Sequence, residues 1–196
     1  STLLPLMIKN WREVWNEKDF PFYFVQIAPY NYGDATKSAV LRESQLKTLS
    51  VPNTGMAVTL DIGQADNIHP ADKENVGERL ALWALAKNYN KKIIFSGPVY
   101  KSMKIKNGKI IIDFNYADGG LVLKNIDDSG SFLIAGNDKK FVKADIKIEG
   151  NKLIVSSPLI KNPASVRYAF YNTPKAVLFN KSGLPASSFR TDDWDE

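Results

Sequence analysis

The chain of 196 residues is long enough to bury one good hydrophobic core or two small ones. Hydrophobic residues make up 44% of it and charged residues 24%, which is typical of a globular protein and excludes a disordered or fibrous one. The absence of cysteine excludes disulfides, thiolate zinc sites and a cysteine nucleophile. The formal charge of +5 comes from lysines scattered through the second half, and no apolar run approaches a membrane span, so we expect neither nucleic acid nor a membrane as a partner.

The first half of the chain alternates helical and extended patterns. Apolar residues at spacings of three and four predict amphipathic helices, whereas continuous apolar runs predict strands that are buried on both faces. In chain order these patterns predict helix, strand, helix, strand and helix at residues 1–16, 20–30, 37–50, 56–62 and 70–90. The third of these segments is expected to turn Val40, Leu41, Leu46 and Leu49 inward.

Strands that are apolar on both faces, with helices between them, favour an α/β fold with a doubly wound parallel sheet. Two strands are too few for such a sheet. We therefore expect residues 1–92 to be the end of an α/β domain whose beginning is absent.

After about residue 92 the period of the apolar residues changes to two. The stretch 101–116 contains a Lys-Asn-Gly turn between alternating runs, which is typical of a hairpin. Further short strands are expected at residues 121–126, 131–136, 142–157 and 165–171. Residues 93–196 are therefore predicted to form an antiparallel β module, most simply a sandwich, that packs closely on the first half.

The histidine at position 69 is the only one in the chain, and it lies between the second predicted strand and the helix that follows. The carboxyl ends of parallel strands are where open α/β sheets bind ligands. Asp66, three residues earlier, could accept the Nδ1 proton of His69 and leave Nε2 free as a base. The alternative is that Asp66 or Asn67 caps the helix and His69 is a solvated residue of its first turn. Asp61 and Asp72 are rival carboxylates to orient the ring.

No recognisable motif in the sequence supplies a nucleophile for this base. There is no Gly-x-Ser-x-Gly elbow, and in "GDATKS" an alanine stands where a Gly-Asp-Ser block would have its serine. The chain therefore contains a candidate base and a carboxylate to orient it, but no recognisable nucleophile.

Several ordered stretches resemble the C-terminal part of the sialate O-acetylesterases, in the SGNH hydrolase superfamily. They include "DFPFYFVQIAPY", "VTLDIGQADNIHPADKENVGERLALWALAKNY" and "VRYAFYNTPKAVLFNKSGLPASSFRTDDW". The resemblance extends from about residue 5 to 194. It implies that residues 1–92 are the C-terminal part of an SGNH-type domain. Asp66 and His69 would then be the last of the catalytic motifs along that domain.

The resemblance implies deacetylation of sialic acid by serine acyl-enzyme chemistry without a metal or organic cofactor. The serine and the oxyanion donors would come from an N-terminal part of the same enzyme, so that this chain alone would be inactive. It also implies an extracytoplasmic location, periplasmic or secreted, and an acetylated sugar as substrate. Two candidate substrate-binding residues are Gln26, near the end of the first strand, and Arg42, which could pair with the sialic acid carboxylate. The alternative for Gln26 is a structural amide, and that for Arg42 is an intrahelical or helix–loop ion pair with a nearby acid.

Two other functions stay open at this point. The enzyme could deacetylate xylan or another polysaccharide by the same mechanism. The chain could also be a noncatalytic carbohydrate-binding module, with stacking platforms at Tyr116, Tyr168, Tyr171 and Trp194.

Overall fold

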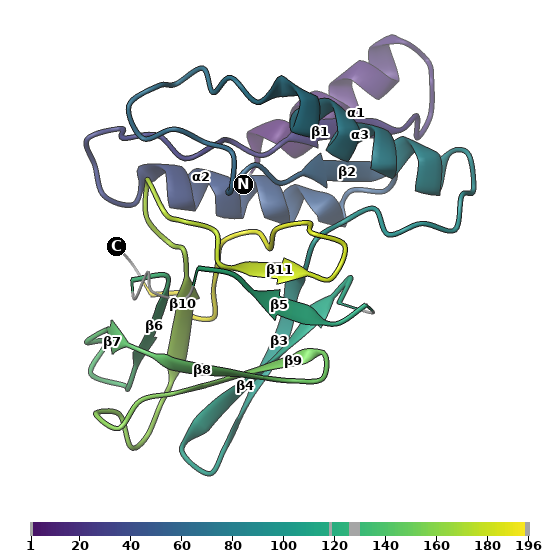
Figure 1. The fold of residues 1–196 in the computed structure, drawn as a ribbon. Helices are drawn as coiled ribbons and strands as arrows, with labels where there is room; N and C mark the ends of the chain where they lie inside the picture. Colours follow the sequence, from purple (N-terminus) through teal and green to yellow (C-terminus); the bar gives the residue numbers. More distant parts are fainter. Residues whose placement is uncertain (1, 118, 126–129, 195–196) are drawn as a thin grey trace.

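The computed structural model describes residues 2–117, 119–125 and 130–194. Three helices and a pair of strands lie together on one side of the molecule, and antiparallel strands lie on the other (Figure 1). The elements of the first part are α1 (Leu3–Val14), β1 (Phe22–Val25), α2 (Lys37–Lys47), the 3-10 helix η1 (Thr48–Ser50), β2 (Thr54–Ala57) and α3 (Lys73–Lys87). Those of the second part are β3 (Val99–Lys106), β4 (Lys109–Asn115), β5 (Leu121–Leu123), β6 (Phe132–Ala135), β7 (Val142–Lys143), β8 (Asp145–Glu149), β9 (Lys152–Ser156), β10 (Ser165–Tyr168), β11 (Leu178–Asn180) and β12 (Phe189–Arg190).

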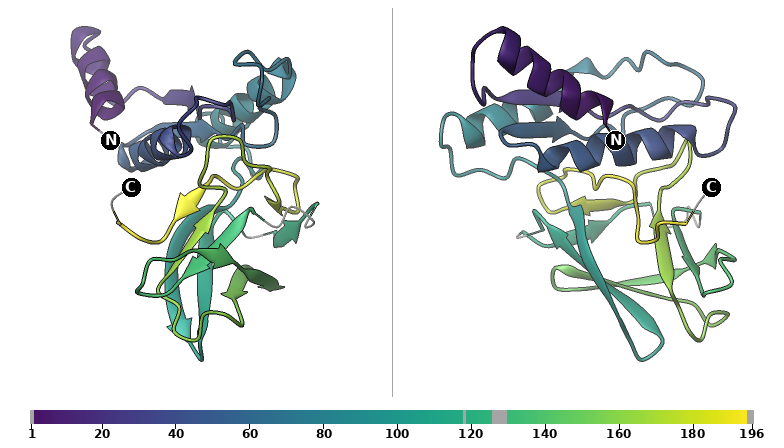
Figure 2. Two further views of the ribbon diagram at one scale, coloured as in Figure 1. Left: turned by 90° about the vertical axis from the view of Figure 1, so that its left-hand side faces the viewer. Right: turned by 180° about the vertical axis from the view of Figure 1, so that it is seen from behind.

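The strands of the first part, β1 and β2, run parallel, from Phe22 opposite Thr54 to Val25 opposite Ala57. Helix α3 packs on this pair, and α1 lies on the other side (Figure 2). The mixed α/β class is thus confirmed. Within the described residues β1 and β2 pair only with each other, so a doubly wound sheet stays a prediction. No helix in the described part of the chain is both long and apolar enough to cross a bilayer.

Several details of this part differ from the expectations. Residues of β1 are only partly buried, and Val25 is 37% exposed; among the described strands β1 has a neighbour at one edge only, which is β2. Val40 and Leu41 of α2 are 38% and 46% exposed, so their predicted inward orientation is wrong. The buried face of α2 instead carries Ser38, Ala39 and Arg42, because its neighbours there offer hydrogen-bonding groups.

The second part is antiparallel, as the period of two predicts. It contains sheets in the orders β12-β10-β6-β7 and β3-β4-β9-β8 and the small pair β11-β5. The predicted Lys-Asn-Gly hairpin turn is confirmed between β3 and β4, where Asn107 and Gly108 have φ of 50° and 68°, as a two-residue turn with both central residues left-handed requires. Strands β11 and β12 were not anticipated, and Ile126, the expected end of one strand, lies outside the described residues.

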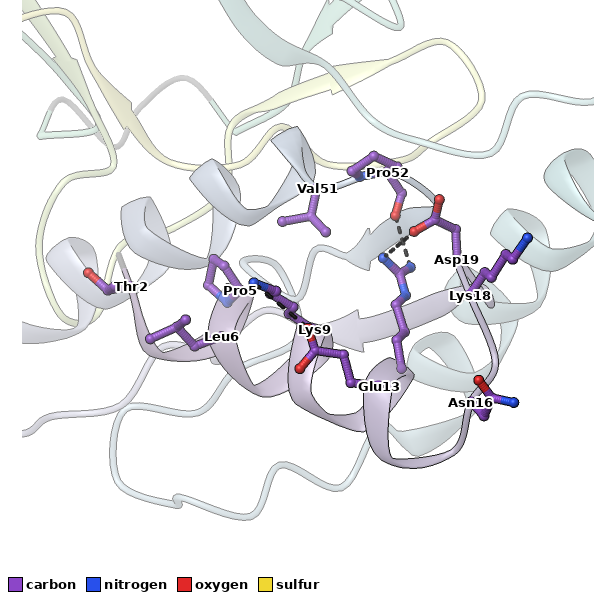
Figure 3. Close-up of a pocket in the computed structure, with 11 residues that line it drawn as sticks. Thr2, Pro5, Leu6, Lys9, Glu13, Asn16, Lys18, Asp19, Val51 and Pro52 are labelled. Atoms are coloured by element: carbon purple, nitrogen blue, oxygen red, sulfur yellow. Dashed lines mark hydrogen bonds and ion pairs between the residues drawn. The ribbon is translucent and has the colours of Figure 1, made fainter.

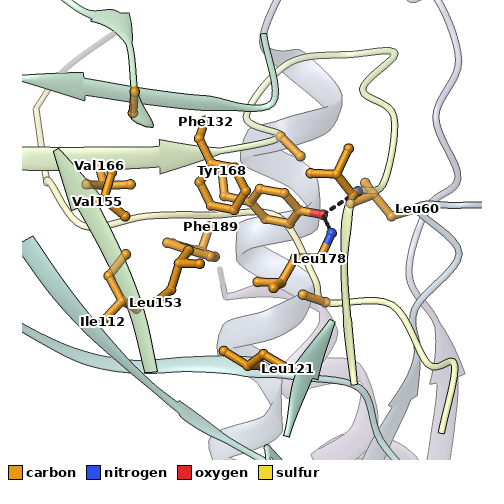
Figure 4. Close-up of a cluster of buried hydrophobic side chains, with 14 of the residues drawn as sticks. Leu60, Ile112, Leu121, Phe132, Leu153, Val155, Val166, Tyr168, Leu178 and Phe189 are labelled. Atoms are coloured by element: carbon orange, nitrogen blue, oxygen red, sulfur yellow. Dashed lines mark hydrogen bonds between the residues drawn. The ribbon is translucent and has the colours of Figure 1, made fainter. Parts of the chain in front are cut away.

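One hydrophobic core joins the two parts. Met56, Val58 and Leu60, from β2 and the residues after it, belong to the same buried cluster as the inward side chains of β4, β6, β9 and β10 (Figure 4). The division into domains at residues 92 and 93 therefore stays a prediction, because the chain buries both halves in a common interior.

Tyr168 lies at the centre of this cluster. Its side chain is fully buried, and its hydroxyl accepts the backbone N–H groups of Val177 and Leu178 at 3.1 and 3.0 Å. Burial raises the pKa of Tyr168 to about 12. A ring enclosed in this way cannot stack on a sugar, which removes Tyr168 from the candidate platforms.

Candidate active site

The segment from β2 to α3 places His69 on the surface. Strand β2 ends at Ala57, rather than at residue 62, because its pairing with β1 ends where Val25 faces Ala57. The chain then passes through buried residues 58–60 and emerges as a loop. His69 lies in this loop and is exposed, as predicted from its position between a strand and a helix.

A tight turn orders the backbone before His69. The Asn67 N–H donates to the Gln64 carbonyl at 3.3 Å, and the Asn67 side-chain amide donates to Gln64 Oε1 at 2.9 Å. Asn67 Oδ1 then accepts the backbone N–H of His69 at 2.9 Å. The Asn31 N–H donates to the Ala65 carbonyl at 3.0 Å, which ties the turn to the loop after β1. The backbone of His69 is therefore held, while its imidazole faces solvent.

Asp66 is exposed in the same turn. Between the described residues, no hydrogen bond or ion pair joins its carboxylate to the His69 ring, so the Asp66–His69 pair stays a prediction. The helix cap is neither Asp66 nor Asn67. Asp72 caps α3, which begins at Lys73 rather than at Pro70, by accepting the Asn75 N–H at 3.0 Å.

Both rival carboxylates bind other side chains. Asp61 forms a two-point ion pair with Arg79, with Nη1 and Nη2 each 2.7 Å from a carboxylate oxygen. Asp72 accepts two hydrogen bonds from Asn75, and the bond from the backbone N–H is the main reason that the pKa of Asp72 is lowered. Neither rival carboxylate therefore contacts the His69 ring among the described residues, and the role of Asp66 stays a prediction.

Gln26 follows β1 directly, at the expected end of the strand, and it is fully buried. Its backbone N–H donates to Ala57, and its carbonyl accepts the Thr59 hydroxyl at 2.7 Å. Its side-chain amide donates to the Arg42 carbonyl at 3.1 Å and to the Ser187 hydroxyl at 2.8 Å. These contacts join β1, α2 and the C-terminal segment, and they fit the alternative of a structural amide; substrate contact by Gln26 stays a prediction.

Arg42 is also fully buried. Its guanidinium donates to the Ser188 and Ser38 hydroxyls at 3.0 and 3.1 Å and to the carbonyls of Ala169 and Tyr171. Burial among neutral oxygens lowers the pKa of Arg42 to about 10. Neither the intrahelical nor the helix–loop ion pair weighed from the sequence forms among the described residues, because the partners of Arg42 there are hydroxyls and carbonyls. Its contacts connect α2 to the β module, and pairing with a substrate carboxylate stays a prediction.

A polar hollow of about 480 Å³ adjoins the base of the His69 loop. Asp61, Asn75 and Arg79 line it from the α/β part, and Lys124 and Lys175 line it from the β module. Sequence reasoning missed this hollow because the two lysines are far from the loop in the chain. No local pattern connects them to it. Within the described ranges no group of three or more histidine, aspartate and glutamate side chains is arranged to hold a metal ion.

Comparisons with known proteins place this geometry in context. No family model matches the chain. It is 27% identical to the sialate O-acetylesterase of Rattus norvegicus and 26% identical to that of Mus musculus, in both cases over 96% of the chain and 40% of the relative. The sialate O-acetylesterase of Homo sapiens is 30% identical over 57% of the chain and 25% of the relative. The chain thus spans less than half the length of these relatives.

Among solved structures, a carbohydrate acetylesterase from Xanthomonas citri superposes with a TM-score of 0.92 at 39% identity, over 97% of this chain and 45% of that one. The resemblance inferred from the sequence motifs is therefore confirmed: over nearly its whole length, this chain is similar to a portion of the sialate O-acetylesterases and of a carbohydrate acetylesterase.

Proposed function

We propose that this chain is part of a carbohydrate acetylesterase that removes O-acetyl groups from sialic acid. The observation that carries the proposal is the similarity, at a TM-score of 0.92 and 39% identity, to a carbohydrate acetylesterase over 97% of the chain. The names of the curated relatives favour sialic acid as the sugar. Acetylated xylan or another acetylated polysaccharide is the second candidate substrate, because the same chemistry would serve it.

In the proposed reaction His69 is the general base. Its exposed ring takes the proton of a serine hydroxyl as the serine oxygen attacks the acetyl carbonyl, and it returns that proton to the departing sugar oxygen. Water then attacks the acyl-serine and releases acetate, with His69 again accepting the proton. Asp66 stabilises the imidazolium form. The exposed carboxylate of Asp66, three residues before a histidine whose backbone is fixed by Asn67, supports these roles.

The serine and the oxyanion donors would belong to the portion of the enzyme beyond this chain, so we expect the chain alone to be inactive. The surface around α1 supports such a partner. Leu6 and Trp15 are 53% and 61% exposed, and a groove of about 680 Å³ runs between α1 and the segment at Val51 and Pro52 (Figure 3). An extracytoplasmic location is part of the same proposal.

The test uses the whole enzyme that contains this chain. Replacing His69 with alanine is expected to lower kcat on O-acetylated sialic acid by about 10⁴-fold, because the base is lost while binding contacts remain. Asp66→Asn is expected to cause a smaller but still large loss. Ile68→Ala, at an exposed position of the same loop, is the matched control and should leave kcat unchanged.

Retention of full activity by His69→Ala would overturn the assignment of the base. Comparing kcat/KM for acetylated sialic acid and acetylated xylan decides between the two substrates. A chain that bound sugars but showed no His69-dependent hydrolysis in the whole enzyme would instead be a noncatalytic module.

A further inference from the structure

A second hollow, of about 580 Å³, lies at the end of the parallel strands opposite to the His69 loop. The starts of β1 and β2, the C-terminal end of α3 and Tyr116, directly after β4, enclose it. Three aromatic side chains from distant parts of the sequence meet there: Tyr23, Trp83 and Tyr116. Its volume lies within the range of small-molecule sites in proteins.

The aromatic walls of this hollow are fixed by packing. A Cβ on Gly55 of β2 would lie 2.5 Å from the Trp83 ring and 2.8 Å from the Tyr23 ring, so both rings rest on the backbone of the strand. Trp83 is 3% exposed, and its indole N–H donates to the Met56 carbonyl at 3.0 Å. The ring centroid of Tyr116 lies 6.0 Å from that of Trp83 in an edge-on arrangement. The hollow is therefore preformed, with Trp83 in its floor and two half-buried tyrosines in its walls.

The backbone at the rim is strained. Tyr116 has a φ of 59°, a left-handed conformation that is unfavourable for a bulky residue. Such outliers cluster at binding sites, where the surrounding structure maintains them. Here the strained conformation brings the Tyr116 ring to Trp83.

The polar groups of the hollow are amides and a single cation. The Tyr23 hydroxyl donates to Asn88 Oδ1, which leaves the Asn88 amide nitrogen as a donor. Asn53 donates to the Asp19 carbonyl at 2.8 Å, which leaves its Oδ1 as an acceptor. Lys87 supplies the cation, and no described lining residue is acidic.

We propose that this hollow is a noncatalytic carbohydrate-binding site for a pyranose ring of a neutral or acidic sugar. Aromatic walls match the apolar C–H faces of a pyranose, and fixed amides match its hydroxyls, whereas the absence of described carboxylates and the presence of Lys87 disfavour cationic ligands. The site is separate from His69 and does not depend on the esterase assignment. It would hold another sugar unit of a glycan at the opposite end of the strands.

The test is a titration of the ¹⁵N-labelled chain with N-acetylneuraminic acid and with xylohexaose, followed by NMR. With at least one of the sugars, the indole N–H signal of Trp83 should shift saturably, while that of Trp194 stays in place. Asn88→Ala, at an exposed position, should weaken this binding about tenfold. Tyr116→Asn, which removes the ring but suits a left-handed backbone, should do the same.

Tyr89→Ala is the matched control, because Tyr89 is 69% exposed and lies outside the hollow. His69→Ala should also leave the affinity unchanged, which separates this site from the esterase site. Melting temperatures verify the fold, and if Tyr116→Asn fails to fold, Asn88→Ala decides. The absence of a saturable Trp83 shift with both sugars, or unchanged affinity in Asn88→Ala, would overturn the proposal.

Discussion

Arginine side chains make many of the polar contacts between the two parts of the chain. Arg42 of α2 reaches the carbonyls after β10 and the hydroxyl of Ser188. In the opposite direction, Arg190 of β12 binds Glu43 of α2 with two hydrogen bonds, at 3.1 and 3.2 Å. The planar fork of arginine can satisfy several acceptors at once. One face of α2 is therefore polar although it is buried.

Asp192 is the buried carboxylate of this polar network. Its side chain is 1% exposed; it accepts the Ser165 hydroxyl at 2.6 Å and two hydrogen bonds from Arg167, at 3.1 and 2.9 Å. Burial by itself would raise the pKa of Asp192, but the hydrogen bonds from Arg167 and Ser165 outweigh it and hold the pKa below its ordinary value of 3.8. The ionised form is therefore favoured in the folded protein.

We expect Asp192→Asn to lower the free energy of unfolding at pH 7 by about 2–3 kcal/mol, because it removes the charge of a buried carboxylate that Arg167 and Ser165 both contact. Asp192 stabilises the fold above pH 3.8, and this contribution is lost as the pH falls through its depressed folded value. Urea unfolding at pH 7 and pH 3 should therefore show a smaller acid loss for the variant than for the parent. Equal acid losses would contradict this assignment.

At the scale of elements, the sequence predicts best what depends on local patterns. The helices, the hairpin at Asn107 and the antiparallel second half follow from apolar periods and turn residues, and the exposed loop of His69 follows from its position between a strand and a helix. The predicted inward orientation of Val40 and Leu41 was wrong, because tertiary partners decide which face of α2 is buried there. Leu46 and Leu49 do pack against the core, as predicted. The buried contacts of Gln26 and Arg42 with Ser187 and Ser188 leave no local signal, since the partners lie at the other end of the chain.

Gly97, just before β3, shows how tightly the elements meet at the junction. A Cβ at this position would collide with the backbone carbonyl of Pro185. A backbone group cannot move aside as a flexible side chain can, so we expect Gly97→Ala to cost about 3 kcal/mol or more in unfolding free energy.

Gly77→Ala is the matched control for this prediction. Gly77 lies inside α3, and nothing would contact an added Cβ within 4 Å. This change should be neutral or stabilise the chain by up to about 1 kcal/mol, because alanine favours a helix over glycine. Chemical denaturation of both variants tests the contrast, and similar effects of the two substitutions would refute it.

At the scale of the whole molecule, the side of the α/β part that faces the β module is covered, whereas its outer side exposes apolar side chains. Met56, Val58 and Leu60 are enclosed by the β module, but α1 and the residue that follows it expose several apolar side chains. These are Leu3, Leu6, Trp11, Val14 and Trp15. Exposed apolar surface next to a free strand edge favours association with another chain.

We therefore expect the isolated chain to self-associate as its concentration rises. Trp15→Lys should reduce this association, because it places a charge at the end of α1, next to the exposed apolar side chains. Leu159→Lys, at a position that is 75% exposed near the end of β9, is the control and should have no effect. Sedimentation velocity over a range of concentrations measures both, and a parent chain that stays monomeric throughout would contradict the expectation.

The hydrogen bond between Gln26 and Ser187 spans 161 positions of the sequence. On the ribosome, β1 and α2 emerge long before Ser187 and Ser188, so the polar contacts of Gln26 and Arg42 with these serines form only after both serines have left the exit tunnel. Such long-range closure is slow, and unfinished intermediates expose surfaces that aggregate. Gln26 and Arg42 lack these buried partners until then, so we expect the nascent chain to need shielding from aggregation at least until residue 188 has emerged.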